Sequence, residues 1–139
     1  NEDLLSIADF AFRNGHYDLA AELYLRWYEF NGEAAEPAIL NDVAWRLYLS
    51  NRELVKAIEI AQKSFFLEAE PETADTLARI LYLTGAAEEA VALEDRAARE
   101  AEGSRSETYR GVAQRMEAGE PLDDKPSFDS YPGTRRRAL

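Results

Sequence analysis

The chain has 139 residues, the length of one ordinary domain, and 46% of them are hydrophobic, which is enough to build a core. Lys and Arg number 16 against 27 Asp and Glu, and the net charge of −11 argues against a nucleic-acid-binding protein, because phosphate contacts need a basic surface. The absence of cysteine excludes disulfides, thiol catalysis and cysteine-ligated zinc.

Apolar residues recur with helical spacing in seven segments of the chain. The first segment shows the pattern plainly, with apolar residues at Leu4, Ile7, Ala8 and Ala11. In chain order, we expect the seven helices to end near Gly15, Gly32, Asn51, Pro71, Gly85, Gly103 and Gly119. No window alternates apolar and polar residues as a strand would, so the sequence predicts an all-α fold with consecutive helices antiparallel.

The composition changes after Gly119. Residues 120–139 contain three prolines, few aliphatic residues and the basic run 135–137. Such a segment cannot build a packed helix, so we expect an extended or disordered tail. Charged residues interrupt every apolar stretch well before the roughly 18 residues of a membrane span, which predicts a soluble chain of unknown compartment. Because the first residue is Asn1, we expect a processed chain or a piece of a longer one, without a targeting segment.

An internal repeat is the most informative pattern. A small residue lies midway along the first helix of three successive helix pairs, and another lies near the start of each second helix. These residues are Ala8, Ala44 and Ala78, and Ala20, Ala57 and Ala90. The first set is spaced by 36 and 34 residues and the second by 37 and 33. A period near 34 with a paired-helix unit is typical of the tetratricopeptide repeat.

The motif residues resemble that family one by one. The first unit reads L-x-x-I-A-x-x-A-F-x-x-G-x-Y-x-x-A-x-x-x-Y from Leu4 to Tyr24, and the third reads L-A-x-x-L-Y-x-x-G-x-x-x-x-A from Leu77 to Ala90. The second unit is one residue longer in its turn, with Asn51 near the family's glycine position. Trp27 and Glu94 depart from the pattern, since they stand where small and large apolar residues are usual.

The resemblance implies a helical solenoid within residues 1–119. Its repeats would span about 2–34, 37–70 and 71–103, each an antiparallel helix pair, followed by a capping helix at 104–118. Stacking is required because a lone helix pair cannot bury its apolar face.

A search for catalytic chemistry gives nothing specific. The single histidine, His16, is expected to be a solvated turn residue, and no HExxH, GxSxG, GxGxxG or P-loop motif occurs. Many carboxylates lie four residues before a basic residue, which indicates a solvated, ion-paired exterior; examples are Glu59–Lys63, Asp75–Arg79 and Asp95–Arg99. We therefore expect no enzymatic activity, no metal and no cofactor.

The resemblance also implies which residues face a concave groove formed by the first helices. The expected partner-binding residues are Asp9, Phe12, Arg13, Asn41, Asp42, Trp45, Tyr48, Asp75, Arg79 and Tyr82. Trp45 is either a binding hot spot or a packing residue, and packing is favoured for the tyrosines. A subclass of the family holds a terminal carboxylate with Lys and Asn, but those positions here are Leu5, Asp9, Asp42, Glu72 and Thr76. Carboxylates repel a carboxylate, so a basic or neutral segment is expected instead.

The sequence thus predicts a non-catalytic scaffold that binds a peptide or helix of a partner protein, and neither nucleic acid nor a membrane. The alternative is a helical docking module of a larger protein, because N-x-x-A-W at 41–45 and D-T-L-A at 75–78 resemble helical arrays attached to some bacterial thioredoxin-like proteins. The chemistry would then lie outside this chain. Self-association through the basic tail or the ends of the solenoid stays open.

Overall fold

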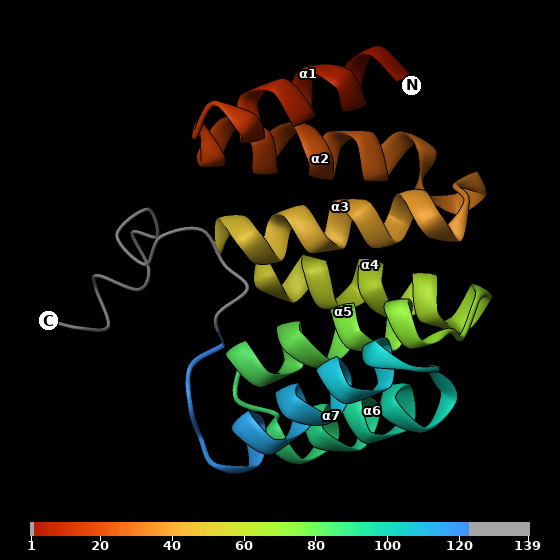
Figure 1. The fold of residues 1–139 in the computed structure, drawn as a ribbon. Coiled ribbons are helices and arrows are strands. Elements are labelled where there is room, and N and C mark those ends of the chain that lie inside the picture. Colours follow the sequence, from red (N-terminus) through yellow and green to blue (C-terminus); the bar gives the residue numbers. More distant parts are fainter. Residues whose placement is uncertain (1, 123–139) are drawn as a thin grey trace, which may run out of the picture.

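The computed structural model describes residues 2–122, and this part of the chain is all-α (Figure 1). It contains seven α-helices, one short 3-10 helix and no strand, which confirms the predicted fold class for these residues. The helices are α1 (Glu2–Arg13), α2 (Tyr17–Asn31), α3 (Pro37–Ser50), α4 (Leu54–Leu67), α5 (Pro71–Leu83), α6 (Ala87–Glu100) and α7 (Ser104–Glu117), and the 3-10 helix η1 (Gly32–Ala34) follows α2. Of the predicted tail, only residues 120–122 are among those described.

The helix ends follow the local sequence. Pro37 and Pro71 occupy the first positions of α3 and α5, where a missing N–H costs no helical hydrogen bond. Gly15 ends the first helix with a φ of +79°, a left-handed conformation that side chains disfavour. Asn51 takes the same conformation after α3 with a φ of +55°, which confirms the predicted end of this helix near Asn51.

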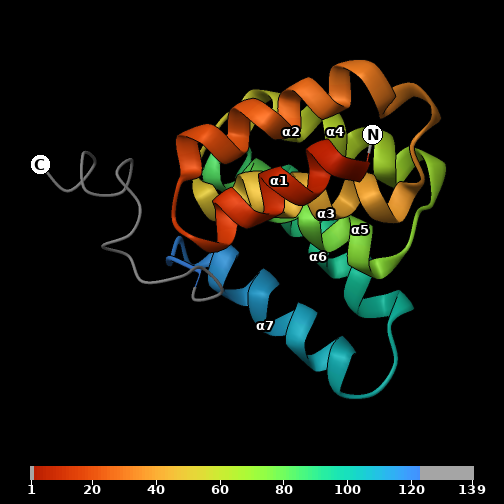
Figure 2. The same cartoon turned by 90° about the horizontal axis from the view of Figure 1, so that it is seen from above.

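The helices pack mainly on their neighbours in the chain. α1 packs against α2, α3 against α4, α5 against α6, and α6 also against α7. Contacts of α2 with α3, of α4 with α5 and of α3 with α5 join these groups. Figure 1 shows the helices following one another in chain order from α1 to α5. In Figure 2, which views the molecule from above, α1 lies over α3, and α2 lies to one side of both helices. One side of the molecule is thus built from α1, α3 and α5.

The repeated small residues form the centre of the helix contacts. All six of the alanines named for the repeat have an exposed fraction of 0%. Trp27, which departs from the family pattern, is also buried and packs in the same core. Small residues at these positions let the helix backbones approach closely. The regularly spaced alanines of the sequence therefore mark the positions at which the helices pack on one another.

Residues 120–122, the described part of the segment after α7, form neither helix nor strand but pack against the helices. Leu122 is only 8% exposed and packs in the main core, and the Tyr82 hydroxyl donates a hydrogen bond of 2.6 Å to the backbone carbonyl of Glu120. The chain therefore turns back onto α5 through residues 120–122. An isolated leucine between proline and aspartate carries no periodic signal, which is why the sequence did not indicate this contact.

Candidate functional site: an acidic and aromatic cavity

A cavity of about 340 Å³ lies where α3, α5 and α7 meet. Its carboxylates are Asp42 from α3 and Glu72 and Asp75 from α5. Asn41 and Thr76 add neutral polar groups, and the rings of Trp45 and Tyr109 complete the lining. The same helical spacing that buries one face of α3 and α5 places these residues on the neighbouring face. The cavity therefore combines negative charge with aromatic surface.

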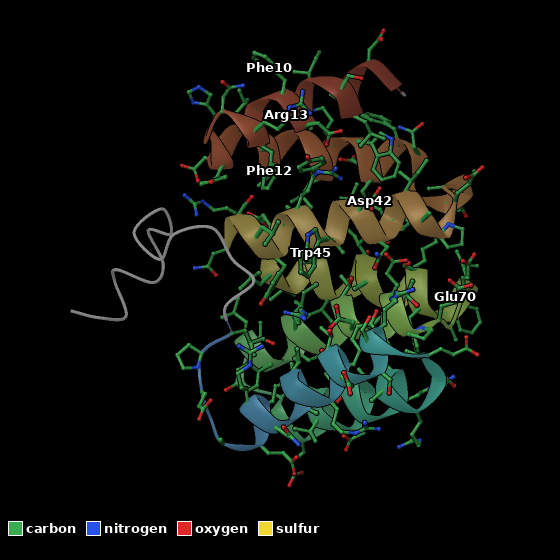
Figure 3. All side chains as sticks on the ribbon, in the orientation of Figure 1. Phe10, Phe12, Arg13, Asp42, Trp45 and Glu70 are labelled. Carbon is green, nitrogen blue, oxygen red and sulfur yellow. The ribbon has the colours of Figure 1, made fainter. Side chains whose placement is uncertain are left out.

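The aromatic rings are held by their neighbours. The rings of Trp45 and Tyr48 lie 5.3 Å apart, and the Arg79 guanidinium lies 5.7 Å from the Trp45 ring centroid (Figure 3 shows Trp45 and Asp42 on α3). An arginine on α7, Arg105, donates a hydrogen bond of 2.8 Å to the Tyr109 hydroxyl. Fixed aromatic faces lose little conformational freedom when a ligand binds.

One polar atom in the lining lacks a protein partner. The Oδ1 atom of Asn41 is buried and accepts no hydrogen bond from any residue in the described part of the chain. A buried acceptor without a donor is costly, so a ligand that brings an N–H group to this atom would recover a hydrogen bond.

Burial and like charges act together on Asp42. Partial burial raises the pKa of its carboxyl group, Arg46 opposes the rise, and Glu72 and Asp9 add to it. Asp9 is itself engaged, because it accepts a hydrogen bond from the Tyr24 hydroxyl and lies 3.5 Å from the Arg46 Nε atom. A carboxyl group whose pKa is raised by burial and by neighbouring carboxylates is a group whose ionised form a cation would stabilise.

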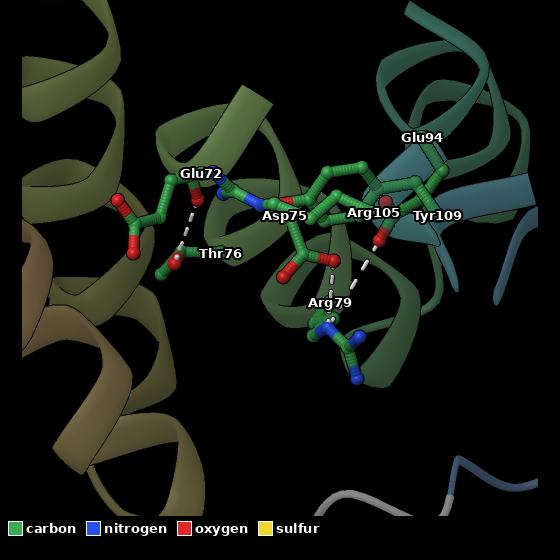
Figure 4. Close-up of polar contacts among 7 residues, drawn as sticks. All are labelled: Glu72, Asp75, Thr76, Arg79, Glu94, Arg105 and Tyr109. Atoms are coloured by element: carbon green, nitrogen blue, oxygen red, sulfur yellow. Dashed lines mark hydrogen bonds and ion pairs between the residues drawn. The ribbon is translucent and has the colours of Figure 1, made fainter. Parts of the chain in front are cut away.

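Behind the cavity, Arg79 forms a buried charged cluster with carboxylates from two helices (Figure 4). Its Nε atom lies 2.8 Å from Asp75 Oδ1 on α5 and 4.0 Å from Glu94 Oε2 on α6. Arg79 is 6% exposed and Glu94 is 0% exposed. The Asp75–Arg79 pair was predicted as part of a solvated exterior, and that interpretation is wrong, because the two side chains of this pair within α5 are only 14% and 8% exposed.

The other predicted exterior pairs also differ in detail. Glu59 pairs with Lys56, at 3.2 Å, rather than with Lys63. Arg96 rather than Arg99 forms the ion pair of α6, at 3.3 Å from Glu100. A carboxylate four residues before a basic residue therefore indicated which helices carry ion pairs, but it did not identify the residues that form each pair.

The structure brings only some of the expected groove residues together. Asn41, Asp42, Trp45 and Asp75 line the cavity. The three residues of α1 lie outside its lining: Asp9 bonds to Tyr24, the Phe12 ring lies 5.8 Å from the Tyr17 ring, and Arg13 is exposed.

Three further expected residues serve the fold instead of facing a ligand. Tyr48 and Arg79 are buried, and the Tyr82 hydroxyl is occupied by the carbonyl of Glu120. Packing is the role that the sequence favoured for the two tyrosines, whereas the burial of Arg79 was not expected.

Sequence reasoning did not place Tyr109 in the site. The residue fits the apolar period of the last helix and is indeed buried in it, while its edge lines the cavity. The sequence predicted a capping helix at 104–118 after the third pair, and α7 indeed packs on α6. That Tyr109 of this helix also reaches the residues of α3 and α5 in the cavity was not indicated by its spacing.

A larger cavity, of about 460 Å³, lies on the opposite side, along α2 and the connection between α3 and α4. Its basic residues already have acidic partners in the structure, with Arg52 bound to Asp18 and Arg26 lying 3.8 Å from Glu22. The lining of this larger cavity includes two arginines and no aromatic ring, whereas the lining of the smaller cavity includes two aromatic rings and no basic residue, so the smaller cavity is the better candidate for a cationic ligand.

Two searches of residues 2–122 give negative results. No group of three or more His, Cys, Asp or Glu side chains in this part of the chain is arranged to hold a metal ion. Within the same residues, no helix combines the length and the apolar character needed to cross a membrane. Comparison of the chain with protein-family models, with curated proteins and with solved structures finds no match.

Proposed function

We propose that this protein is a non-catalytic interaction scaffold of the tetratricopeptide type, which binds a basic segment of a partner protein. In this proposal the pairs α1–α2, α3–α4 and α5–α6 are three antiparallel repeats of a solenoid, and α7 is the capping helix. The ligand lies across α3, α5 and α7.

Two observations support the repeat arrangement. The alanines at equivalent positions of the three units are all fully buried, and the two helices of each pair pack closely on one another, as α7 does on α6. The exposed residues of α7, such as Glu107, Arg110, Gln114 and Glu117, are polar, as the outer face of a terminal helix must be.

The observation that carries the function is the convergence of Asp42, Glu72 and Asp75 with two aromatic rings in one cavity. A guanidinium or ammonium group there would lie near carboxylates and against ring faces, and both contacts favour a cation. Arginine fits best, because its planar guanidinium can pair with a carboxylate and stack on an aromatic ring at the same time. The net charge of −11 would attract such a segment at long range.

The test uses a short peptide of alternating Arg and Ser, and a control peptide with citrulline in place of Arg. Citrulline keeps the shape of arginine and removes its charge. We expect the Arg peptide to shift the indole N–H resonance of Trp45, while Trp27, which does not line this cavity, serves as the reference. The citrulline peptide should leave both resonances unchanged.

Matched variants separate the cavity from the overall charge. Asp42→Asn with Glu72→Gln should weaken binding of the Arg peptide by about tenfold, the lower range for close charge pairs. Glu89→Gln with Glu117→Gln removes the same charge from exposed positions of α6 and α7 and should have little effect. Equal weakening by both pairs would show that the peptide responds only to net charge and would contradict the proposed site.

A further inference from the structure

The outer face of α1 exposes large apolar side chains. Ile7 is 54% exposed and Phe10 is 62% exposed, and with Asp3 they form one stripe along the helix. Figure 3 shows Phe10 on the side of α1 that points away from the other helices. Exposed apolar residues that form a stripe on one helix indicate a contact surface rather than chance exposure.

The repeat shows what this face does in the other units. Counting from the crossing alanines, Ile7 corresponds to Val43 in α3 and to Leu77 in α5, and both are buried. Phe10 corresponds to Arg46, which is partly exposed, and to Ile80, which is 0% exposed. α3 and α5 contact the preceding helices α2 and α4, and Arg46 lies 3.5 Å from Asp9 of α1, so the corresponding residues of α3 and α5 lie next to earlier parts of the chain. The stripe on α1 is therefore the continuation of an interface that the chain forms twice within itself.

We infer that this face binds the same face of a second copy of the chain, with the two α1 helices antiparallel. Ile7 and Phe10 flank the centre of the stripe, so a two-fold axis between them places Ile7 of each copy opposite Phe10 of the other. The same axis brings Asp3, near the start of one helix, beside the last turn of the other, which carries Arg13. Both charged residues are exposed and opposite in sign.

Other occupants fit less well. The outer face of α7 is polar, so a second copy stacked end to end would cover apolar side chains with charged ones. Antiparallel α1 helices instead bury four large apolar side chains and align opposite ends of the two helix dipoles. The contact is one helix wide, which is small for a protein interface, so the dimer is expected to be weak.

The experiment measures the mass of the 139-residue chain by sedimentation equilibrium from micromolar to millimolar concentration. The mass should rise from one chain toward two. Phe10→Glu should weaken the association by at least about tenfold, because it places a charge in the apolar centre. Phe66→Glu is the matched control: Phe66 is 87% exposed on α4, outside the stripe, and this variant should dimerise like the original chain.

A charge exchange tests the antiparallel register. Asp3→Arg and Arg13→Asp should each weaken the dimer, and the chain with both substitutions should recover the original affinity. A chain that stays monomeric at millimolar concentration would overturn the inference, as would equal weakening by Phe10→Glu and Phe66→Glu. Failure of the double exchange to recover affinity would overturn the register. None of these variants touches the cavity between α3, α5 and α7, so this result is independent of peptide binding.

Discussion

The first and third helix pairs have the same packing sites but different polar contacts beside them. In both, the crossing alanines are fully buried. In each of these pairs, the residue that follows the alanine of the first helix contacts a residue of the second helix. That second residue lies four positions after the alanine of its own helix. In the first unit these are Asp9 and Tyr24, joined by a neutral hydroxyl that donates to a carboxylate. In the third unit they are Arg79 and Glu94, a buried ion pair.

This difference shows how one packing scheme accommodates different chemistry. The alanines fix how closely the two helices approach, and the adjacent positions then take any pair that satisfies its own polar groups. Burial raises the pKa of the Tyr24 hydroxyl, and its hydrogen bond to Asp9 raises it further, so Tyr24 remains a neutral donor. In the second unit the same positions are Trp45 and Ala61, which leaves an aromatic ring beside the cavity.

The largest effect is expected from breaking the charged pair of the third unit. Arg79→Ala leaves the Glu94 carboxylate at 0% exposure without its guanidinium neighbour. Removing one partner of a buried ion pair typically lowers the free energy of unfolding by about 3–5 kcal/mol. Urea unfolding followed by circular dichroism measures the change. A loss below about 1 kcal/mol would show that the pair contributes little.

A triple variant keeps this test informative if Arg79→Ala fails to fold. Arg79→Met with Glu94→Leu and Asp75→Asn removes all three charges of the cluster. Replacement of a whole buried ion network by uncharged side chains of similar volume is often neutral in stability, so the triple variant should unfold close to the original chain.

The second prediction concerns Trp45. This residue of the second unit is equivalent to Asp9 in the first unit and to Arg79 in the third. Trp45→Ala should weaken binding of the Arg peptide by about 2 kcal/mol or more, as truncation of a hot spot does. The ring also packs on Tyr48, so some loss of stability is expected. Titration calorimetry on the fraction that is folded separates the two effects. Unchanged affinity together with a strong fall in melting temperature would identify Trp45 as a packing residue only.

The third prediction tests whether the crossing sites are equivalent. Ala57→Leu and Ala90→Leu each add volume where the exposed fraction is 0%. Overpacking of this kind costs about 1–3 kcal/mol of unfolding free energy, measured by denaturant midpoints. Ala92→Leu, at an exposed position of α6, is the matched control and should change stability little. Unchanged midpoints in both crossing variants would contradict the repeat register.

The helices were predictable because their signals are local. Apolar spacing, Pro37 and Pro71 at helix starts, and Asn51 in a left-handed turn each act within a few residues. The repeat spacing also predicted which alanines are buried, because equivalent positions in repeated units have similar packing.

The cavity was predictable only in part because it depends on contacts between distant helices. Asn41, Asp42, Trp45 and Asp75 followed from the register of α3 and α5. The positions of Tyr109 in the cavity and of Leu122 in the core depend on how α7 and residues 120–122 pack against the earlier helices. The spacing of residues in the sequence does not specify this packing. Arg79 is buried against Glu94, which lies on another helix, α6. The spacing of ion pairs within one helix therefore predicted its partner Asp75 but not its burial.

The fourth prediction weakens the polar contact of the first unit. Tyr24→Phe removes the hydroxyl that donates to Asp9 and keeps the ring in the core. Asp9 retains Arg46 at 3.5 Å and is partly exposed, so the expected loss of unfolding free energy is about 1 kcal/mol. Urea unfolding of this variant beside Arg79→Ala compares the two units directly. A loss in Tyr24→Phe as large as in Arg79→Ala would show that the two contacts are equally important.

The smallest effect concerns Asp42, whose equivalents in the first and third units are the neutral Ser6 and Thr76. Because burial raises the pKa of Asp42 in the folded chain, the folded state binds its proton more tightly than the unfolded state does. The stability of the original chain should therefore increase as the pH falls through this raised pKa. Asp42→Asn removes the ionised carboxylate and should raise the free energy of unfolding at neutral pH by up to about 0.5 kcal/mol. This gain should vanish below the pKa of the unfolded carboxyl group.

Binding should change in the opposite direction at the same residue. At neutral pH the Asp42→Asn variant loses a carboxylate that faces the Arg peptide, so its affinity should be lower than that of the original chain. As the pH falls and Asp42 takes up its proton, the two affinities should converge. Urea unfolding and peptide titration across the same pH range measure both quantities. A variant that is less stable at neutral pH would show that the ionised Asp42 stabilises the fold, and a variant that binds the Arg peptide as tightly as the original chain would show that Asp42 does not contact the ligand.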